Sequence, residues 1–148
     1  MKQKADIKEA LYDDIFDIAE LEKKYIPGGW SESGFREWHS GERRIFLKAV
    51  IDDRIVGFVN GSWLLDEGEL LNIAVDDEFR RCGIGRLLMQ ALFEKMREQG
   101  VEKLFLEVRE KNISAQSFYQ MLGFGECGRR NGYYAAPPDN AVILCAEL

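Results

Sequence analysis

Residues that build metal and redox sites are scarce in this sequence. Its 148 residues include one histidine and three cysteines, and the cysteines, Cys82, Cys127 and Cys145, lie far apart without a C-x-x-C pair. This argues against a zinc site and a disulfide framework, so we expect no metal, and reduced thiols as in a cytoplasmic protein. The single histidine, His39, lies in a polar stretch with no nucleophile motif to serve, which leaves a Ser-His-Asp triad without support.

Long apolar runs and low-complexity linkers are also lacking. No segment approaches the roughly 18 to 20 apolar residues of a membrane span, so we expect neither a membrane partner nor an export signal. The 20 basic and 26 acidic residues give a formal charge of -6, the wrong sign for holding nucleic acid by its phosphates. We therefore expect a single cytoplasmic domain over residues 1–148, a monomer or weak dimer, whose acidic surface suits a basic peptide or amine.

Two kinds of hydrophobic periodicity are present. Apolar residues three and four apart predict helices. Four helices are expected, at about residues 13–25, after the N-cap candidate Ser31, at 84–99 and at 114–122. Apolar runs between turn signals predict strands at about residues 45–51, 55–65, 69–75, 103–109, 126–134 and 141–147. The passage from Glu69 to Arg109 requires a parallel, right-handed crossover, so the fold class is α/β, with a mixed sheet of about seven mostly antiparallel strands and four helices.

A glycine-bearing turn, residues 81–86, joins a predicted strand to the following helix. The first turn of a helix leaves backbone N–H groups unpaired and the helix dipole favours anions there, while Gly83 and Gly85 would let a phosphate approach the main chain. Arg81 and Arg86 would add positive charge. On the G-x-G spacing alone a tight structural turn is the simpler interpretation, and the spacing fits neither a nucleotide-triphosphate loop nor the dinucleotide fingerprint.

The run Arg80-Arg81-Cys82-Gly83-Ile84-Gly85 resembles the Q/R-x-x-G-x-G/A signature of the GNAT N-acetyltransferase superfamily, in the strand-to-helix setting that the family requires. A second stretch, residues 104–109 followed by Asn112, Tyr119 and Gly123-Phe124, resembles the superfamily's second cofactor-binding region. Within the superfamily, the chain is similar to the ribosomal-protein alanine N-acetyltransferases through most of its length. That similarity rests on Asp66-Glu67, Asn72 to Asp76, Leu106 to Arg109, Tyr119, Arg129 to Asn131 and Tyr133-Tyr134.

The resemblance implies direct transfer of an acetyl group from acetyl-CoA to the N-terminal amine of a basic protein, such as a small-subunit ribosomal protein that begins with alanine. It also implies that the backbone of residues 73–75 pairs with the pantetheine arm and donates an N–H to the thioester oxygen. The expected cofactor-binding residues are Ile73, Ala74, Val75, Arg81, Cys82, Gly83, Ile84, Gly85, Arg86 and Asn112. Asn112 is also a candidate N-cap of the next helix. A covalent acetyl-cysteine route through Cys82 is the weaker alternative, because the family transfers directly.

Three residues are candidates for proton transfer. Glu107 is the first choice of general base, by resemblance and because a carboxylate is anomalous in a buried parallel strand. Glu69 is the rival, since it stands at the place of the general base of related histone acetyltransferases, and strand alternation predicts that it shares a face with Ile73 and Val75. Tyr119 is the expected proton donor to the departing thiolate, by resemblance. Either carboxylate could instead be an exposed strand-end charge, and Tyr119 a core residue.

Two loops depart from the subfamily's pattern. Its Pro-Trp pair appears here as Pro27-Gly28-Gly29-Trp30, and Gly132 interrupts its Arg-Asn-Tyr-Tyr run. Both loops are those expected to touch the acceptor, which leaves a lysine side chain or a small-molecule amine as the second interpretation. A CoA-binding module without turnover is the third, and the presence of Glu107 and Tyr119 argues against it, because a binder needs neither a base nor an acid.

Overall fold

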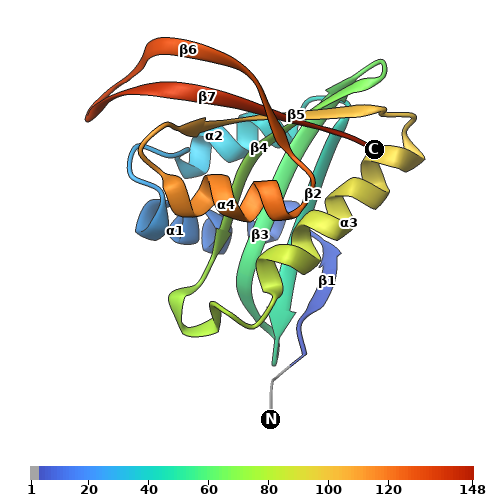
Figure 1. Ribbon diagram of the computed structural model, residues 1–148. Coiled ribbons are helices and arrows are strands. Elements are labelled where there is room, and N and C mark those ends of the chain that lie inside the picture. The colour runs from blue at the N-terminus through green and yellow to red at the C-terminus, as the bar shows by residue number, and fades with distance from the viewer. Residues whose placement is uncertain (1–3) are drawn as a thin grey trace.

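A seven-stranded mixed sheet forms the centre of the computed structural model, which describes residues 4–148 (Figure 1). The strand order is β1-β2-β3-β4-β5-β7-β6, and all neighbours are antiparallel except β4 and β5. The strands are β1 (Asp6–Glu9), β2 (Arg44–Ile51), β3 (Arg54–Leu64), β4 (Glu67–Val75), β5 (Lys103–Arg109), β6 (Gly125–Ala135) and β7 (Pro138–Glu147). The helices are α1 (Ile15–Tyr25), α2 (Glu32–His39), α3 (Ile84–Glu98) and α4 (Ile113–Met121). The predicted fold class is confirmed, with α3 as the crossover between the two parallel strands.

One strand was not predicted. The four residues of β1 are mostly charged and exposed, so they lack the apolar alternation that marks the other strands. β1 lies at the edge of the sheet beside β2, where charged side chains discourage pairing with another chain.

Within residues 4–148, no helix is long and apolar enough to cross a membrane.

The first two helices differ in how they begin. α1 starts at Ile15, later than predicted, because residues 12–14 form a separate 3-10 turn. α2 starts as predicted, since the Ser31 hydroxyl accepts a hydrogen bond from the Gly34 amide at 3.1 Å and so caps the helix.

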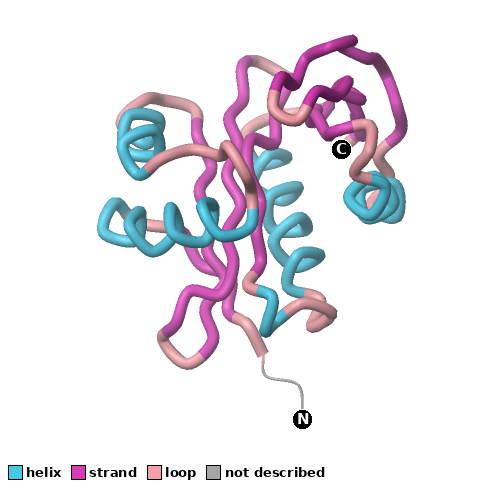
Figure 2. Tube along the Cα trace, turned by 90° about the vertical axis from the view of Figure 1, so that its left-hand side faces the viewer, coloured by secondary structure: helices cyan, strands magenta, loops and turns pink. Residues whose placement is uncertain are grey.

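Helices cover both faces of the sheet, with α1 and α2 on one side and α3 and α4 on the other (Figure 2). The side of α3 is filled by fully buried aliphatic and methionine side chains. They include Leu88, Met89, Leu92, Met96 and Leu104. The side of α1 and α2 is aromatic. The ring centroid of Phe35 lies 6.1 Å from that of Phe46 and 5.6 Å from that of Phe58.

A β-bulge interrupts β4. Asn60 of β3 pairs with Asn72, and the next residue, Gly61, pairs with Leu70, so Leu71 has no partner on β3. Two residues of one strand therefore oppose one residue of its neighbour, which reverses the alternation of side chains along β4.

The bulge decides which way Glu69 points. Before the bulge, a Cβ at Gly68 would point at Met96 of α3. After the bulge, Ile73 and Val75 pack against the hydrophobic cluster that contains Met96. Glu69 lies on the opposite side, which Asn72 also faces. The prediction that Glu69 shares a face with Ile73 and Val75 is therefore wrong, because one inserted residue shifts a period of two.

Candidate functional site

The two parallel strands separate soon after they meet. β4 and β5 pair only from Glu67 with Lys103 to Glu69 with Phe105, after which β5 continues beside β7 (Figure 1). In the described part of the chain, the second half of β4, residues 70–75, therefore has a neighbouring strand only on its β3 edge. Its other edge presents main-chain donors and acceptors that can pair with an extended ligand, the role that the resemblance implies for residues 73–75.

The glycine-bearing turn lies at the end of that strand and leads into α3. Gly83 is the N-cap of α3 with a φ of 77°, and no side chain among residues 4–148 caps the helix. The first amides of this 15-residue helix thus remain available to an anion, and the helix dipole favours negative charge at this end. Arg81 also has a positive φ of 64°, and Arg81 and Arg86 are both exposed, so their charges are free to approach the same anion. The arrangement fits a pyrophosphate.

The two glycines of the turn are needed for different reasons. At Gly83 a Cβ would meet no atom within 4 Å, so the constraint is its left-handed backbone. At Gly85 a Cβ would lie 3.3 Å from Cζ of Phe118, so the constraint is the close packing of α4 on the start of α3. Cys82 is partly buried against the core, as a packing residue would be.

Asp76 fixes the end of β4, directly ahead of the turn. Its carboxylate accepts hydrogen bonds from the Tyr25 hydroxyl and the Glu78 amide, each at 3.1 Å, and Arg54 Nη2 lies 3.0 Å from its other oxygen. Burial alone would raise the pKa of Asp76, but these partners and the charge of Lys24 hold it below its ordinary value. The end of α1, the start of β3 and the loop before α3 therefore meet at one carboxylate.

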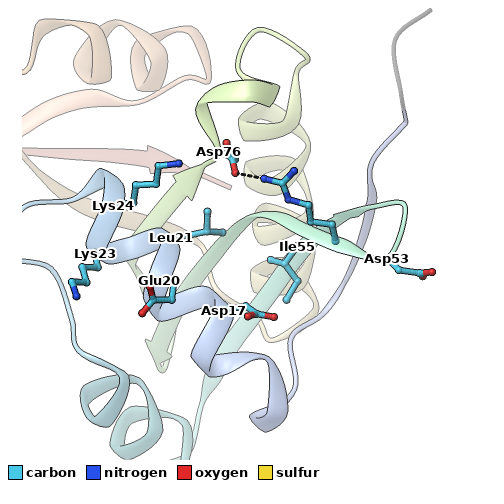
Figure 3. A pocket seen from close by; sticks show the side chains of 9 residues that line it. Asp17, Glu20, Leu21, Lys23, Lys24, Asp53, Ile55 and Asp76 are labelled. Atoms are coloured by element: carbon cyan, nitrogen blue, oxygen red, sulfur yellow. Dashed lines mark hydrogen bonds and ion pairs between the residues drawn. The ribbon is translucent and has the colours of Figure 1, made fainter.

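A hollow of about 720 Å³ lies beside Asp76, between α1 and the turn that joins β2 to β3 (Figure 3). Its walls carry charges of both signs, among them Asp17, Lys24 and Arg54. It contains none of the predicted catalytic or cofactor-binding residues, so the predicted site lies elsewhere, where β4 and β5 separate.

The fold brings the two candidate bases together. Leu104, Leu106 and Val108 of β5 face the core, so Glu107 points to the opposite side, which is also the side that Glu69 faces. The pKa of Glu69 is raised, first by desolvation and then by the negative charge of Glu107, while Arg130 partly offsets both. The interpretation of Glu107 as a carboxylate buried in a parallel strand is wrong, because only the first three residues of β5 pair with β4 and the Glu107 side chain is 22% exposed.

β6 supplies the partners of this acidic pair. Arg130 Nε lies 3.4 Å from the Glu107 carboxylate. The negative charge of Glu107 is also the largest cause of the raised pKa of the Tyr133 hydroxyl. Sequence reasoning gave neither residue a role, although both stand in the stretch that carries the resemblance.

The β6–β7 hairpin is tied to β5 by Arg109. Its guanidinium lies 4.1 Å from the ring centroid of Tyr134 and donates a hydrogen bond to the Pro137 carbonyl at 2.8 Å. Gly132 has a positive φ of 65° and donates its amide to Asn140 Oδ1 at 2.8 Å, within an irregular stretch of the ladder. The extra glycine is therefore absorbed as a local irregularity of the strand.

Tyr119 lies in the core on the other side of β5. Its ring packs against Phe118 and Phe124, with centroids 5.3 and 5.6 Å away. Burial raises the pKa of its hydroxyl, which therefore keeps its proton throughout the neutral range.

Asn112 caps α4 by accepting a hydrogen bond from the Ala115 amide at 3.2 Å, so its alternative role as an N-cap is confirmed.

Sequence reasoning missed one buried polar cluster. Glu22 of α1 has no exposed surface and accepts a hydrogen bond from the Asn72 side chain. The signal was present, because Glu22 follows Ile15 and Ile18 on the apolar face of α1, where a carboxylate is out of place.

Comparisons with known proteins agree on one family. Residues 12–124 match the family model described as the acetyltransferase (GNAT) family. The chain is 39% identical over 131 residues to the [ribosomal protein bS18]-alanine N-acetyltransferase of Salmonella typhimurium, covering 87% of this chain and 88% of that protein. It is 37% identical over 134 residues to the Haemophilus influenzae protein of the same name, covering 88% and 90%. The crystal structure of the ribosomal-protein-S18-alanine N-acetyltransferase from Escherichia coli matches with a TM-score of 0.89 and 31% identity, covering 97% and 94% of the two chains.

Proposed function

The chain belongs to the GNAT family of acetyltransferases, and on this premise we propose that it transfers an acetyl group from acetyl-CoA to the N-terminal alanine of ribosomal protein bS18. Relatives named for that reaction match most of this chain in sequence, and one of them matches it in fold. The observation that carries the proposal is the separation of β4 from β5, which places an unpaired strand edge beside an uncapped helix and an acidic pair.

The donor side would be built largely from main chain. The free edge of residues 73–75 would pair with the pantetheine arm, and the amides at the start of α3, with Arg81 and Arg86, would hold the pyrophosphate. Asn112 would contact the cofactor beside its capping role. An N–H from residues 73–75 aimed at the thioester oxygen would stabilise the charge that develops there.

The acceptor side would be built from side chains. Glu107 removes a proton from the amine, directly or through water, while Glu69 beside it adds negative charge that attracts a cationic N-terminus. The amine nitrogen forms a bond to the acetyl carbon, the carbon–sulfur bond breaks, and Tyr119 gives its proton to the departing sulfur. An N-terminal amine, with a reference pKa near 8, loses its proton more readily than a lysine amine near 10.4.

A peptide assay tests the proposal. Three acceptors are offered with acetyl-CoA: a basic peptide that begins with alanine, the same peptide with a blocked N-terminus and an internal lysine, and a small amine. Thiol release and mass spectrometry should show transfer to the free N-terminus alone, with a rate that rises from about pH 6 to about 8. Transfer to the lysine or the small amine would replace the proposed acceptor, and tight binding of acetyl-CoA without thiol release would replace catalysis by binding alone.

A further inference from the structure

Glu22 is a fully buried carboxylate that joins two segments of the candidate site. It lies on α1, and its Oε2 accepts hydrogen bonds from the Trp30 amide at 3.1 Å and from Asn72 Nδ2. Trp30 lies in the connection between α1 and α2, and Asn72 belongs to β4, next to the edge that would pair with the cofactor. One carboxylate thus links the α1–α2 loop, residues 26–31, to the strand at the centre of the site.

The surroundings of this carboxylate are unusual for a core. Asn72, which bonds the carboxylate, is paired across the strands with Asn60 of β3, and both asparagines are buried. Within residues 4–148, Glu22 Oε1, Asn72 Oδ1 and both polar atoms of the Asn60 side chain have no hydrogen-bond partner. Buried polar atoms normally find partners because leaving them unpaired is costly, so a cluster of them calls for a reason beyond stability. Desolvation raises the pKa of Glu22, which agrees with this setting.

The loop is fitted to the carboxylate at close range. A Cβ at Gly29 would lie 2.7 Å from Cγ of Glu22, closer than real contacts allow. The backbone of Gly29 therefore passes directly over the side chain, and the Trp30 amide that follows is bonded to it. Glu22 therefore fixes the backbone of the loop, while the side chains of Ile26 and Trp30 pack on the aromatic cluster.

The position of the cluster connects it to the acidic pair. Because of the bulge at Leu71, Asn72 and Glu69 face the same side of β4, the side that carries α1 and α2. Glu107 faces that side as well. The loop that Glu22 holds is thus tied to the strand that carries Glu69, on the side of the sheet that both candidate bases face.

We propose that Glu22 is a positioning residue: through Asn72 and Trp30 it holds the α1–α2 loop against β4, so that the loop forms one wall of the acceptor site beside Glu69 and Glu107. The acceptor part of this inference rests on the proposed acetyl transfer. The anchoring of the loop does not, and it can be measured without turnover.

Hydrogen exchange tests the anchoring directly. The Trp30 amide should exchange faster in Glu22→Ala, whereas Glu22→Gln, which keeps an acceptor oxygen, should retain most of the protection. Glu20→Ala, an exposed carboxylate on the same helix, is the matched control and should leave Trp30 unchanged. Unchanged protection of Trp30 in Glu22→Ala overturns the proposal whether or not the protein is a transferase.

Steady-state kinetics with acetyl-CoA and the alanine-starting peptide test the acceptor wall. Glu22→Ala should raise the KM for the peptide about 10-fold, the effect of losing one well-made hydrogen bond, and leave the KM for acetyl-CoA within about 2-fold. Gly29→Ala keeps Glu22 in the sequence but places a Cβ against its side chain, so the loop and the carboxylate must move apart. It should change the same constant in the same direction, so the test survives if Glu22→Ala does not fold. Equal rises in both KM values, or none in the peptide KM, would show that Glu22 serves only the core. If Glu22→Ala loses the protection of the Trp30 amide but the wild-type protein acetylates no peptide, the proposed function is refuted and the anchoring of the loop by Glu22 stands.

Discussion

The two sides of the sheet differ in the chemistry of their buried side chains. On the side of α3, the fully buried side chains are aliphatic or methionine, and the first turn of the helix offers its backbone to a ligand. On the side of α1 and α2 lie stacked phenylalanines together with buried polar groups, and the unpartnered buried polar atoms within residues 4–148 belong to α1, α2, β2, β3 and β4. Hydrocarbon packing thus supplies stability on one side, while the other side gives up stability by burying polar groups without partners.

The largest expected effect is on rate, on the polar side. Glu107→Gln keeps the shape of the side chain and removes the base, so kcat should fall about 100- to 10,000-fold and the rise of rate with pH should flatten. Thermal unfolding should change little, because the carboxylate is partly exposed and pairs with an exposed arginine. If Glu107→Gln keeps full activity while Glu69→Gln loses it, the roles of the two carboxylates are exchanged.

The next effect is on stability, on the hydrocarbon side. Leu88 has no exposed surface, so Leu88→Ala should lower the free energy of unfolding by about 2 to 5 kcal/mol through lost burial and the cavity left behind. Leu87, its neighbour on α3, is 40% exposed, and Leu87→Ala should cost much less. Chemical denaturation of both variants measures the difference. Equal losses would mean that the core on this side is less well packed than its burial suggests.

A smaller effect separates backbone strain from ligand binding at the two ends of α3. Gly83 and Gly100 have φ values of 77° and 81°, and a Cβ at either would meet nothing within 4 Å. Alanine at either position should therefore cost about 1 to 2 kcal/mol of stability, from the left-handed backbone alone. Only Gly83→Ala should also raise the KM for acetyl-CoA. A matching rise in Gly100→Ala would show that the effect comes from strain in the helix and not from the phosphate site.

The smallest effect concerns the pH dependence of stability at two buried carboxylates. The pKa of Glu22 is raised in the folded state, so the stability it contributes is present in acid and is lost as the pH rises from about 4.5 through the folded pKa. Glu22→Gln should therefore gain stability relative to the wild type between acid and neutral pH. Asp76 has a lowered pKa, so Asp76→Asn should lose most at neutral pH and the difference should shrink in acid. Urea unfolding across that range measures both, and slopes of the same sign would contradict this account.

Most of the fold could be predicted because its elements carry strong local signals. α3 repeats its apolar residues regularly, β5 has the predicted bounds, and the turn before α3 carries a recognisable motif. β1 could not be predicted, because its place at the edge depends on pairing with a strand far along the chain rather than on a pattern of its own.

The candidate site was harder to predict where it depends on register. The run Glu69-Leu70-Leu71-Asn72 gives no sign of a bulge, because Leu71, the extra residue, is as apolar as its neighbour. The side to which Glu69 points is therefore known only from the pairing of β4 with β3. The meeting of Glu69 and Glu107 depends on neighbouring strands that are separated in sequence by α3. Glu22 was visible in the sequence as a charge on an apolar face, but its partners Trp30 and Asn72 were not.

The short ladder between β4 and β5 also makes the sheet mechanically discontinuous. Three residue pairs join the β1–β4 half to the β5–β7–β6 half, and beyond them the two halves are held together chiefly by side chains of the shared core. A donor molecule that pairs with the free edge of β4 would act as a missing length of strand and brace the gap. The sheet would then become stiffer as more of the protein holds a donor molecule. It would be most flexible between turnovers, after the product has left and before the next donor binds.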